Sequence, residues 1–89
     1  MGYDAGFAKS CFPARASSID ALAARDEDFR ELCNDLATAE TLRLDWENSL
    51  DPRRDERYAE CVELVESLRI EIEAVLDRAA VVTFPRRPK

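Results

Sequence analysis

The chain contains no histidine and only two glycines among its 89 residues, and these shortages exclude several classes of protein. Without histidine, it lacks the usual general base and the commonest metal ligand. Without a glycine-rich stretch, it lacks a loop that could cradle phosphate groups, and it has few of the turn residues that a β-sheet needs. Catalysis would have to rest on carboxylates or cysteines alone, with no nucleophile and base in a recognisable arrangement. We therefore expect no enzymatic activity, no cofactor and no metal.

Cysteines are also few, and they are widely spaced. Cys11, Cys33 and Cys61 are odd in number and fit neither a disulfide framework nor a Cys-x-x-Cys zinc motif. We expect Cys33 and Cys61 to be small buried hydrophobes in a reducing compartment. No stretch supplies the roughly twenty apolar residues that a membrane span needs, and residues 1–10 do not resemble a secretory signal. These observations predict a cytoplasmic protein without membrane contact.

The residues that are abundant favour helix. Ala, Leu, Glu and Arg lose little on entering a helix, so we expect an all-α protein. The net charge of −6 is unevenly distributed, because residues 17–50 sum to −6 and residues 51–79 to −4, whereas residues 80–89 sum to +3. An acidic body repels phosphate backbones, which makes nucleic acid an unlikely partner of the helices.

The most regular stretch is a heptad seam in the second half of the chain. Its apolar residues recur at alternating steps of three and four: Tyr58, Cys61, Val65, Leu68, Ile72, Val75, Ala79 and Val82. A strand cannot produce this period, because its side chains alternate every two residues. The spacing predicts a helix over about 52–80, which should end before Pro85 because the residue before a proline leaves the helical region. Residues 81–89 would then be an extended basic tail.

The first half of the chain also shows helical spacing, with one interruption. The run Arg25-Asp26-Glu27-Asp28 places three acids together where Asp would cap a new helix and the next acids would face its positive end. A divalent-cation site is the alternative, but three consecutive acids point in different directions on a helix. We therefore predict helices over about 13–24 and 27–47. Residues 1–11, which contain both glycines, would be a flexible arm.

A short connection around Asp51-Pro52 should make the two long helices antiparallel neighbours. Counting away from this turn brings Trp46 close to Tyr58 and Phe29 close to Val75. A Trp-Tyr pair of this kind usually closes the end of a helix bundle. The expected core of the hairpin comprises Phe29, Leu32, Leu36, Trp46, Tyr58, Val65, Leu68, Ile72 and Val75.

Both long helices carry an apolar face that is wider than one seam requires. The margins of these faces are interface candidates: Val62, Leu64, Leu76, Leu42, Leu44 and Cys33. Monomers rarely expose large apolar patches, so we expect two hairpins to pair as a four-helix bundle, a dimer being favoured. The alternative is that the short amino-terminal helix, with Ile19 and Leu22, folds over that face within one chain.

The order of apolar residues resembles a known family. Phe12-Pro13, then Ile19, Leu22, Phe29 and Leu32, followed by a long helix, a turn and a second heptad-rich helix, are similar to the small bacterial YdcH-like helical-hairpin proteins of unknown function. The resemblance covers residues 12–36 and implies a helical hairpin in a bacterial cytoplasm. It implies no catalytic residue, because that family offers none.

Two functional hypotheses follow. The first is a non-enzymatic interaction module that self-associates and presents an acidic face to a protein partner. The alternative is a nucleic-acid-associated regulator that uses the basic tail, Arg86, Arg87 and Lys89.

Overall fold

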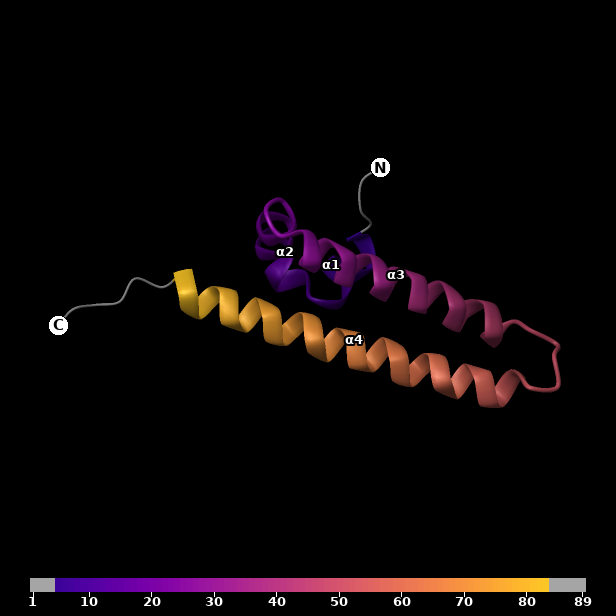
Figure 1. Cartoon of the computed structure of the whole chain (residues 1–89). Coiled ribbons are helices and arrows are strands. Elements are labelled where there is room, and N and C mark those ends of the chain that lie inside the picture. The colour runs from indigo at the N-terminus through magenta and orange to yellow at the C-terminus, as the bar shows by residue number, and fades with distance from the viewer. Residues whose placement is uncertain (1–4, 84–89) are drawn as a thin grey trace.

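The structure, a computed structural model, describes residues 5–83 and consists of helices joined by short connections. The elements are α1 (Gly6–Cys11), a one-turn 3-10 helix η1 (Pro13–Arg15), α2 (Ala16–Ala23), α3 (Glu27–Glu47) and α4 (Arg54–Thr83). Within residues 5–83 there is no strand. The long helices α3 and α4 lie antiparallel, and the shorter elements pack near the end that is remote from their connecting turn (Figure 1). The predicted all-α hairpin with a short amino-terminal helical segment is confirmed.

Helix α3 begins and ends where the sequence predicted. The Asp26 carboxylate accepts a hydrogen bond from the Phe29 backbone N–H at 3.1 Å, so it satisfies one of the free amides at the helix start. Glu27 and Asp28 follow in the first turn, where their negative charge faces the positive end of the helix dipole. The acidic run is therefore a helix cap, as predicted.

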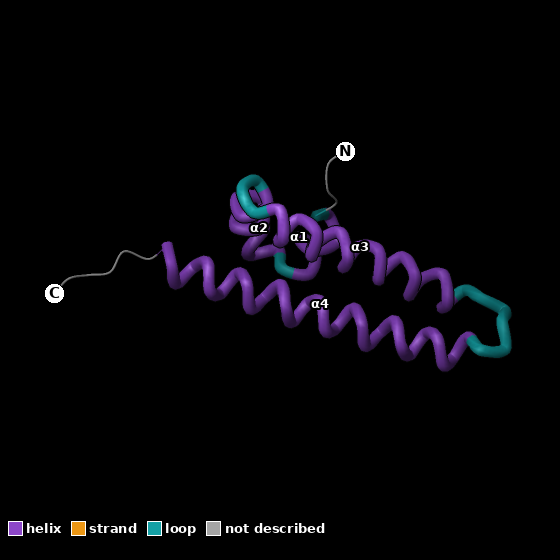
Figure 2. The backbone as a smooth tube through the Cα atoms, in the orientation of Figure 1, coloured by secondary structure: helices purple, strands orange, loops and turns teal. Residues whose placement is uncertain are grey.

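Helix α4 is displaced relative to its prediction at both ends. It begins at Arg54 rather than at residue 52, because Asp51 and Pro52 form a turn before it (Figure 2). The Asp51 carboxylate accepts from the Arg53 backbone N–H at 2.8 Å, and the Asp51 carbonyl accepts from the Arg54 N–H at 2.9 Å. The helix continues to Thr83, so the predicted extended tail begins too early. Residues 84–89, including the basic residues of that tail, lie outside the described residues.

The core of the hairpin follows the predicted seam over most of its length. Phe29, Leu36, Val65 and Ile72 are buried, and Leu32, Leu68 and Val75 are partly buried against them. Trp46 and Tyr58 were predicted to belong to this core, but both are only half-buried and lie outside the core cluster. Of the elements in residues 5–83, only α3 and α4 reach the turn end of the hairpin, so the side chains there keep contact with solvent.

The prediction of a flexible arm over residues 1–11 is wrong for residues 5–11, and residues 1–4 lie outside the described residues. Residues 6–11 form α1, and Ala5 and Ala8 are buried, the latter completely. A six-residue helix is not stable alone, so its order comes from packing against α3. The predicted helix over 13–24 is likewise divided, since Pro13–Arg15 form the 3-10 turn and Ala16–Ala23 form α2.

We call residues 5–23, which comprise α1, η1 and α2, the amino-terminal cluster. It packs mainly against α3, and it also contacts α4 on one side of the hairpin. The Arg15 guanidinium lies 2.8 Å from the Asp77 carboxylate, and the Arg69 guanidinium lies 6.0 Å from the centre of the Phe12 ring. Ile19 and Ala23 of α2 are fully buried in the shared core. The half of this long side that is remote from the turn is therefore covered from within the same chain.

Candidate functional site: an uncovered groove along the hairpin

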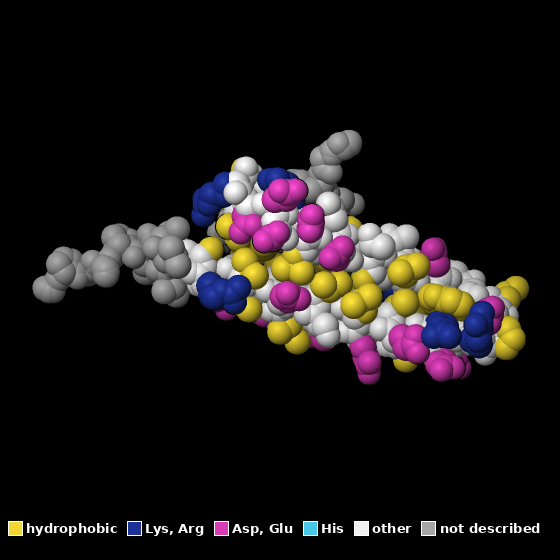
Figure 3. Space-filling view, in the orientation of Figure 1, with side chains coloured by type: hydrophobic (Ala, Val, Ile, Leu, Met, Phe, Trp, Pro, Cys, Tyr) yellow, Lys and Arg dark blue, Asp and Glu magenta, His cyan; other side chains and the backbone are white. Residues whose placement is uncertain are grey.

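The opposite side of the hairpin carries an apolar groove that no other described element covers. At 100° per residue, Leu64, Leu68 and Val75 lie on one margin of α4, and Arg69 and Asp77, which contact the cluster, lie on the other. The matching margin of α3 contributes Leu32, Ala39 and Leu42. Figure 3 shows the result as a band of hydrophobic side chains that runs between α3 and α4. We call this surface the open groove.

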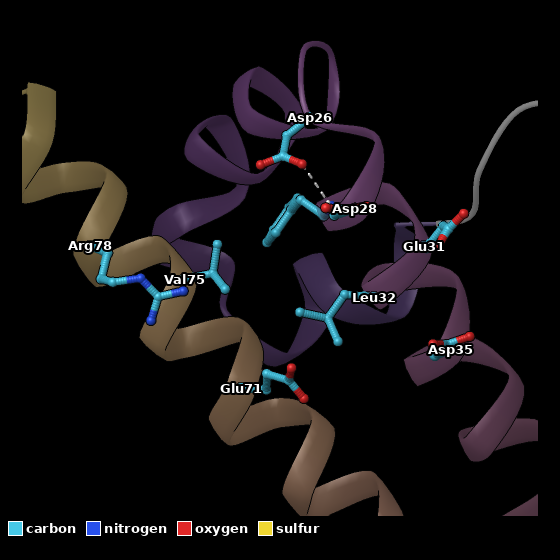
Figure 4. A pocket seen from close by; sticks show the side chains of 9 residues that line it. Asp26, Asp28, Glu31, Leu32, Asp35, Glu71, Val75 and Arg78 are labelled. Atoms are coloured by element: carbon cyan, nitrogen blue, oxygen red, sulfur yellow. Dashed lines mark hydrogen bonds between the residues drawn. The ribbon is translucent and has the colours of Figure 1, made fainter.

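The half of the open groove that is remote from the turn has an acidic rim. This acidic half is a hollow of about 420 Å³ with Phe29, Leu32 and Val75 among its lining residues. The carboxylates of its rim come from Asp26, Asp28, Glu31, Asp35 and Glu71. Asp28, Glu31 and Asp35 lie on α3, Asp26 caps its start, and Glu71 lies on α4 (Figure 4). The arrangement combines an apolar floor with negative charge on both walls.

Within residues 5–83, no basic side chain neutralises the rim acids. Asp28, Glu31, Asp35 and Glu71 form no ion pair with any described residue, and Asp26 is engaged only in capping α3. Arg78 is the one basic residue that lines the acidic half, and it has no carboxylate partner among residues 5–83. By contrast, several acids on the covered side are paired, for example Glu66 with Arg69 at 2.6 Å. The acidic half therefore offers unpaired charge beside apolar surface.

The half of the open groove nearer the turn is apolar and nearly free of charge. It is a hollow of about 240 Å³ lined by Asp35, Thr38, Ala39, Leu42, Leu64 and Leu68. Leu42 and Leu64 are 43% and 46% exposed, although each is a large aliphatic side chain beside an apolar hollow. Asp35 lines both hollows, so the two halves form one continuous groove.

A second exposed apolar margin lies near the turn on the other side of the hairpin. Leu44 and Val62 are 43% and 39% exposed there, because the amino-terminal cluster does not extend that far along α3 and α4. Four of the predicted interface candidates, Leu42, Leu44, Val62 and Leu64, are thus placed on the surface. The structure contains a single chain, so their role in an interface stays a prediction.

The other two interface candidates are corrected by the structure. Cys33 is fully buried and Leu76 is only 2% exposed, and both belong to the core that the hairpin shares with the amino-terminal cluster. Leu76 lines a small hollow together with Leu22 of α2. The reason is that α1 and α2 cover the margin of the hairpin on which these two residues lie. The sequence alternative, in which Ile19 and Leu22 fold over the apolar face, describes this side of the molecule.

The turn end holds a polar network in place of the predicted aromatic closure. The Arg43 side chain donates to both carboxylate oxygens of Glu40, at 2.8 and 2.7 Å, and to the Tyr58 hydroxyl at 3.3 Å. The hydrogen bonds to Glu40 and then to Tyr58 raise the pKa of Arg43, and the bond from Arg43 lowers the pKa of Glu40. Arg43 and Arg54 each lie 5.9 Å from the centre of the Tyr58 ring. This network orders the turn end.

The three thiols are free, and burial disfavours the thiolate form of Cys33 and Cys11. Burial raises the pKa of the Cys33 thiol to about 11, and burial also raises the pKa of Cys11 although the nearby Arg69 opposes the shift. A thiol with a raised pKa holds little thiolate at neutral pH, and the thiolate is the reactive form. Cys33 and Cys61 are buried, as predicted.

Within residues 5–83, no group of three or more Cys, Asp or Glu side chains is arranged to hold a metal ion. Over the same residues, no helix combines the length and apolar character that crossing a bilayer requires. Comparison of the chain with known protein families, with curated proteins and with solved structures finds no match.

Sequence reasoning missed the acidic rim as a unit. Its signal was present, because Asp28, Glu31 and Asp35 are spaced by three and four residues and so share one face of α3. Their spacing alone did not show that Glu71 lies across the groove from them. That relation needs the antiparallel register and the knowledge of which side the amino-terminal cluster leaves open.

Proposed function

We propose that this protein is a non-enzymatic helical interaction module that associates with a second copy of itself and binds a protein partner. The observation that carries the proposal is the exposed aliphatic surface of the turn half of the hairpin. Leu42, Leu44, Val62 and Leu64 are each 39–46% exposed there, on both margins of the two-helix layer. A layer of two helices leaves apolar area facing water, and pairing with another such layer buries it.

Self-association through this half fits the distribution of charge. The turn-side hollow is lined by five uncharged residues and a single acid, Asp35, so two copies can meet there with little electrostatic repulsion. The amino-terminal clusters lie at the opposite end and do not obstruct the approach (Figure 1). A four-helix bundle made from two turn halves is the assembly that we propose.

The test replaces Leu64 by Glu and measures the mass of the full chain in solution by sedimentation equilibrium. Burying a carboxylate in an apolar contact without a partner is costly, so Leu64→Glu should weaken dimerisation by at least about tenfold. The matched control is Ile70→Glu, because Ile70 is a 59% exposed aliphatic residue on the same helix that lines neither hollow of the groove. It should leave the dimer intact.

Two results would reject self-association through this half. One is a wild-type chain that stays monomeric at high micromolar concentration. The other is equal weakening by Leu64→Glu and Ile70→Glu, which would mean that added negative charge, and not the apolar margin, controls assembly. Circular dichroism of both variants establishes that each remains helical.

A bacterial, cytoplasmic setting is part of the same proposal and rests on the resemblance of residues 12–36 to the YdcH-like hairpins.

A further inference from the structure

We propose that the acidic half of the open groove binds a basic amphipathic helix of a partner protein. The inference deepens the proposed interaction function by naming the chemistry of the partner, and it concerns the half of the groove that is remote from the turn. Between its charged walls this half is lined by Phe29, Leu32 and Val75, of which Phe29 is almost fully buried and the other two are partly buried. An apolar groove between two parallel ridges accepts the apolar face of a third helix, as in other helix-in-groove complexes.

The charges on the rim of the groove specify which residues should flank the apolar face of the partner helix. Asp28, Glu31 and Asp35 form a stripe along one wall, and Glu71 stands on the other wall. From Asp28 to Asp35 the stripe measures about 10 Å along the axis, which is about two helical turns. A partner helix with Lys or Arg beside its apolar stripe, at steps of three and four residues, places its cations against these unpaired carboxylates.

The same charges argue against a second copy of this chain as the occupant. Two copies related by a two-fold axis would bring Asp28, Glu31, Asp35 and Glu71 of one groove against the same acids of the other. Like charges in contact are destabilising, and this chain has no described basic stripe that would relieve the repulsion. The acidic half therefore suits a partner of opposite charge, and the turn half suits a second copy.

Arg78 gives the occupant a direction. It lies at the edge of the acidic half, without an ion pair to any described residue, and Figure 4 shows its guanidinium beside Val75. The carboxyl end of a helix carries partial negative charge and free carbonyl groups, which a guanidinium can bind. The partner helix should therefore run with its carboxyl end towards Arg78.

The test uses a defined probe, a synthetic peptide of about 15 residues with leucines on one helical face and lysines on both flanks of that face. Two control peptides have the same leucines flanked by glutamates, or the same composition in an order that destroys the apolar face. Binding to the full-length chain is measured by calorimetry at about 0.15 M salt, where surface charges beyond about 8 Å are largely screened. Only the first peptide should bind.

Two matched chain variants each remove four negative charges, one variant inside the groove and the other outside it. Neutralising the rim, with Asp28→Asn, Glu31→Gln, Asp35→Asn and Glu71→Gln, should weaken binding by at least about tenfold. Neutralising four exposed acids that line neither hollow, with Asp45→Asn, Glu56→Gln, Glu63→Gln and Glu73→Gln, should weaken it by less than about twofold. Circular dichroism of both variants checks that they remain folded.

Nuclear magnetic resonance then locates the peptide on the chain. The expected result is a set of shifted amide signals at Leu32, Asp35, Glu71 and Val75. A nitroxide label on the carboxyl end of the peptide should broaden signals near Arg78, and a label on its amino end should not. The reverse pattern would overturn the assigned direction.

Three results would overturn the proposal as a whole. Equal weakening by the two fourfold variants would show attraction to net charge alone, and equal binding of the rearranged peptide would show that no helical face is recognised. If deleting residues 84–89 shifted the groove signals in the absence of peptide, the occupant would be the chain's own basic segment. Sedimentation separates this inference from self-association. A chain that dimerises but does not bind the lysine peptide contradicts only the binding of a basic helix. A chain that stays monomeric and binds the peptide contradicts only self-association.

Discussion

The two long sides of the α3–α4 hairpin carry similar apolar margins, but the amino-terminal cluster packs against only one of them. On one side, the amino-terminal cluster buries Cys33 and Leu76 in a core that includes Ile19. On the other side, Leu42 and Leu64 stay more than 40% exposed along the open groove. The difference teaches that an apolar margin on a helix does not by itself mark an interface, because a short segment of the same chain is enough to cover it.

The charges of the two sides differ in the same way. On the covered side, Arg15 pairs with Asp77 and Arg69 pairs with Glu66. On the open side, four rim acids have no such partners among the described residues. Pairing on the covered side holds a segment in place, whereas unpaired charge on the open side is available to a ligand of opposite sign.

The largest expected contrast is between two leucines of the same helix. Leu76→Ala should lower the free energy of unfolding by about 2–5 kcal/mol, because it leaves a cavity under α2, whereas Leu64→Ala should cost less than about 1 kcal/mol. Urea denaturation at low micromolar concentration measures both, with assembly kept small. Equal losses would mean that the two margins are not differently covered.

A smaller contrast should appear at alkaline pH. Burial raises the pKa of the Cys33 thiol to about 11 from an ordinary value of 9.0. Between these two pH values the unfolded thiol loses its proton while the folded one keeps it, so the free energy of unfolding should fall as the pH rises. Below pH 9 the contribution is fully present, and above pH 11 roughly 1–3 kcal/mol should be lost.

The measurement compares the wild type with Cys33→Ala by urea denaturation at pH 8, 9, 10 and 11. The subtraction removes the titration of other groups, which both proteins share. The difference in stability between them should shrink across this range. Parallel curves would show that Cys33 is not held as a neutral thiol, and hence that the covered side is more open to water than the structure indicates.

The smallest contrast concerns single surface charges. Glu66→Gln on the covered side breaks the ion pair with Arg69 and should cost about 0.2–0.5 kcal/mol at low salt. Glu71→Gln on the open rim breaks no ion pair and should leave stability unchanged or slightly higher, since it relieves repulsion among the rim acids. Thermal unfolding of the two variants, repeated at 1 M salt, tests this, because the effect of Glu66 should then largely disappear.

The sequence predicted the features that depend on local chemistry. The cap at Asp26, the bounds of α3 and the seam through Val65 and Ile72 follow from spacing and from the preferences of single residues. Spacing did not predict α1, because a six-residue helix with a glycine at its start has no stability of its own. It also placed α4 two residues too early, since Asp51 and Pro52 are as well suited to a turn as to a first helical turn.

The sequence by itself determined the pair of long helices and the width of their apolar faces, because helical periodicity is a property of consecutive residues. It also determined their antiparallel arrangement, because the connection between them is short. What only the tertiary structure decided is which margin is covered. The spacing of apolar residues does not say on which side residues 5–23 pack, and in the structure they contact Arg69, Leu76 and Asp77. That arrangement buries Leu76 and Cys33, and it leaves open the groove with its acidic rim, where we propose that a partner binds.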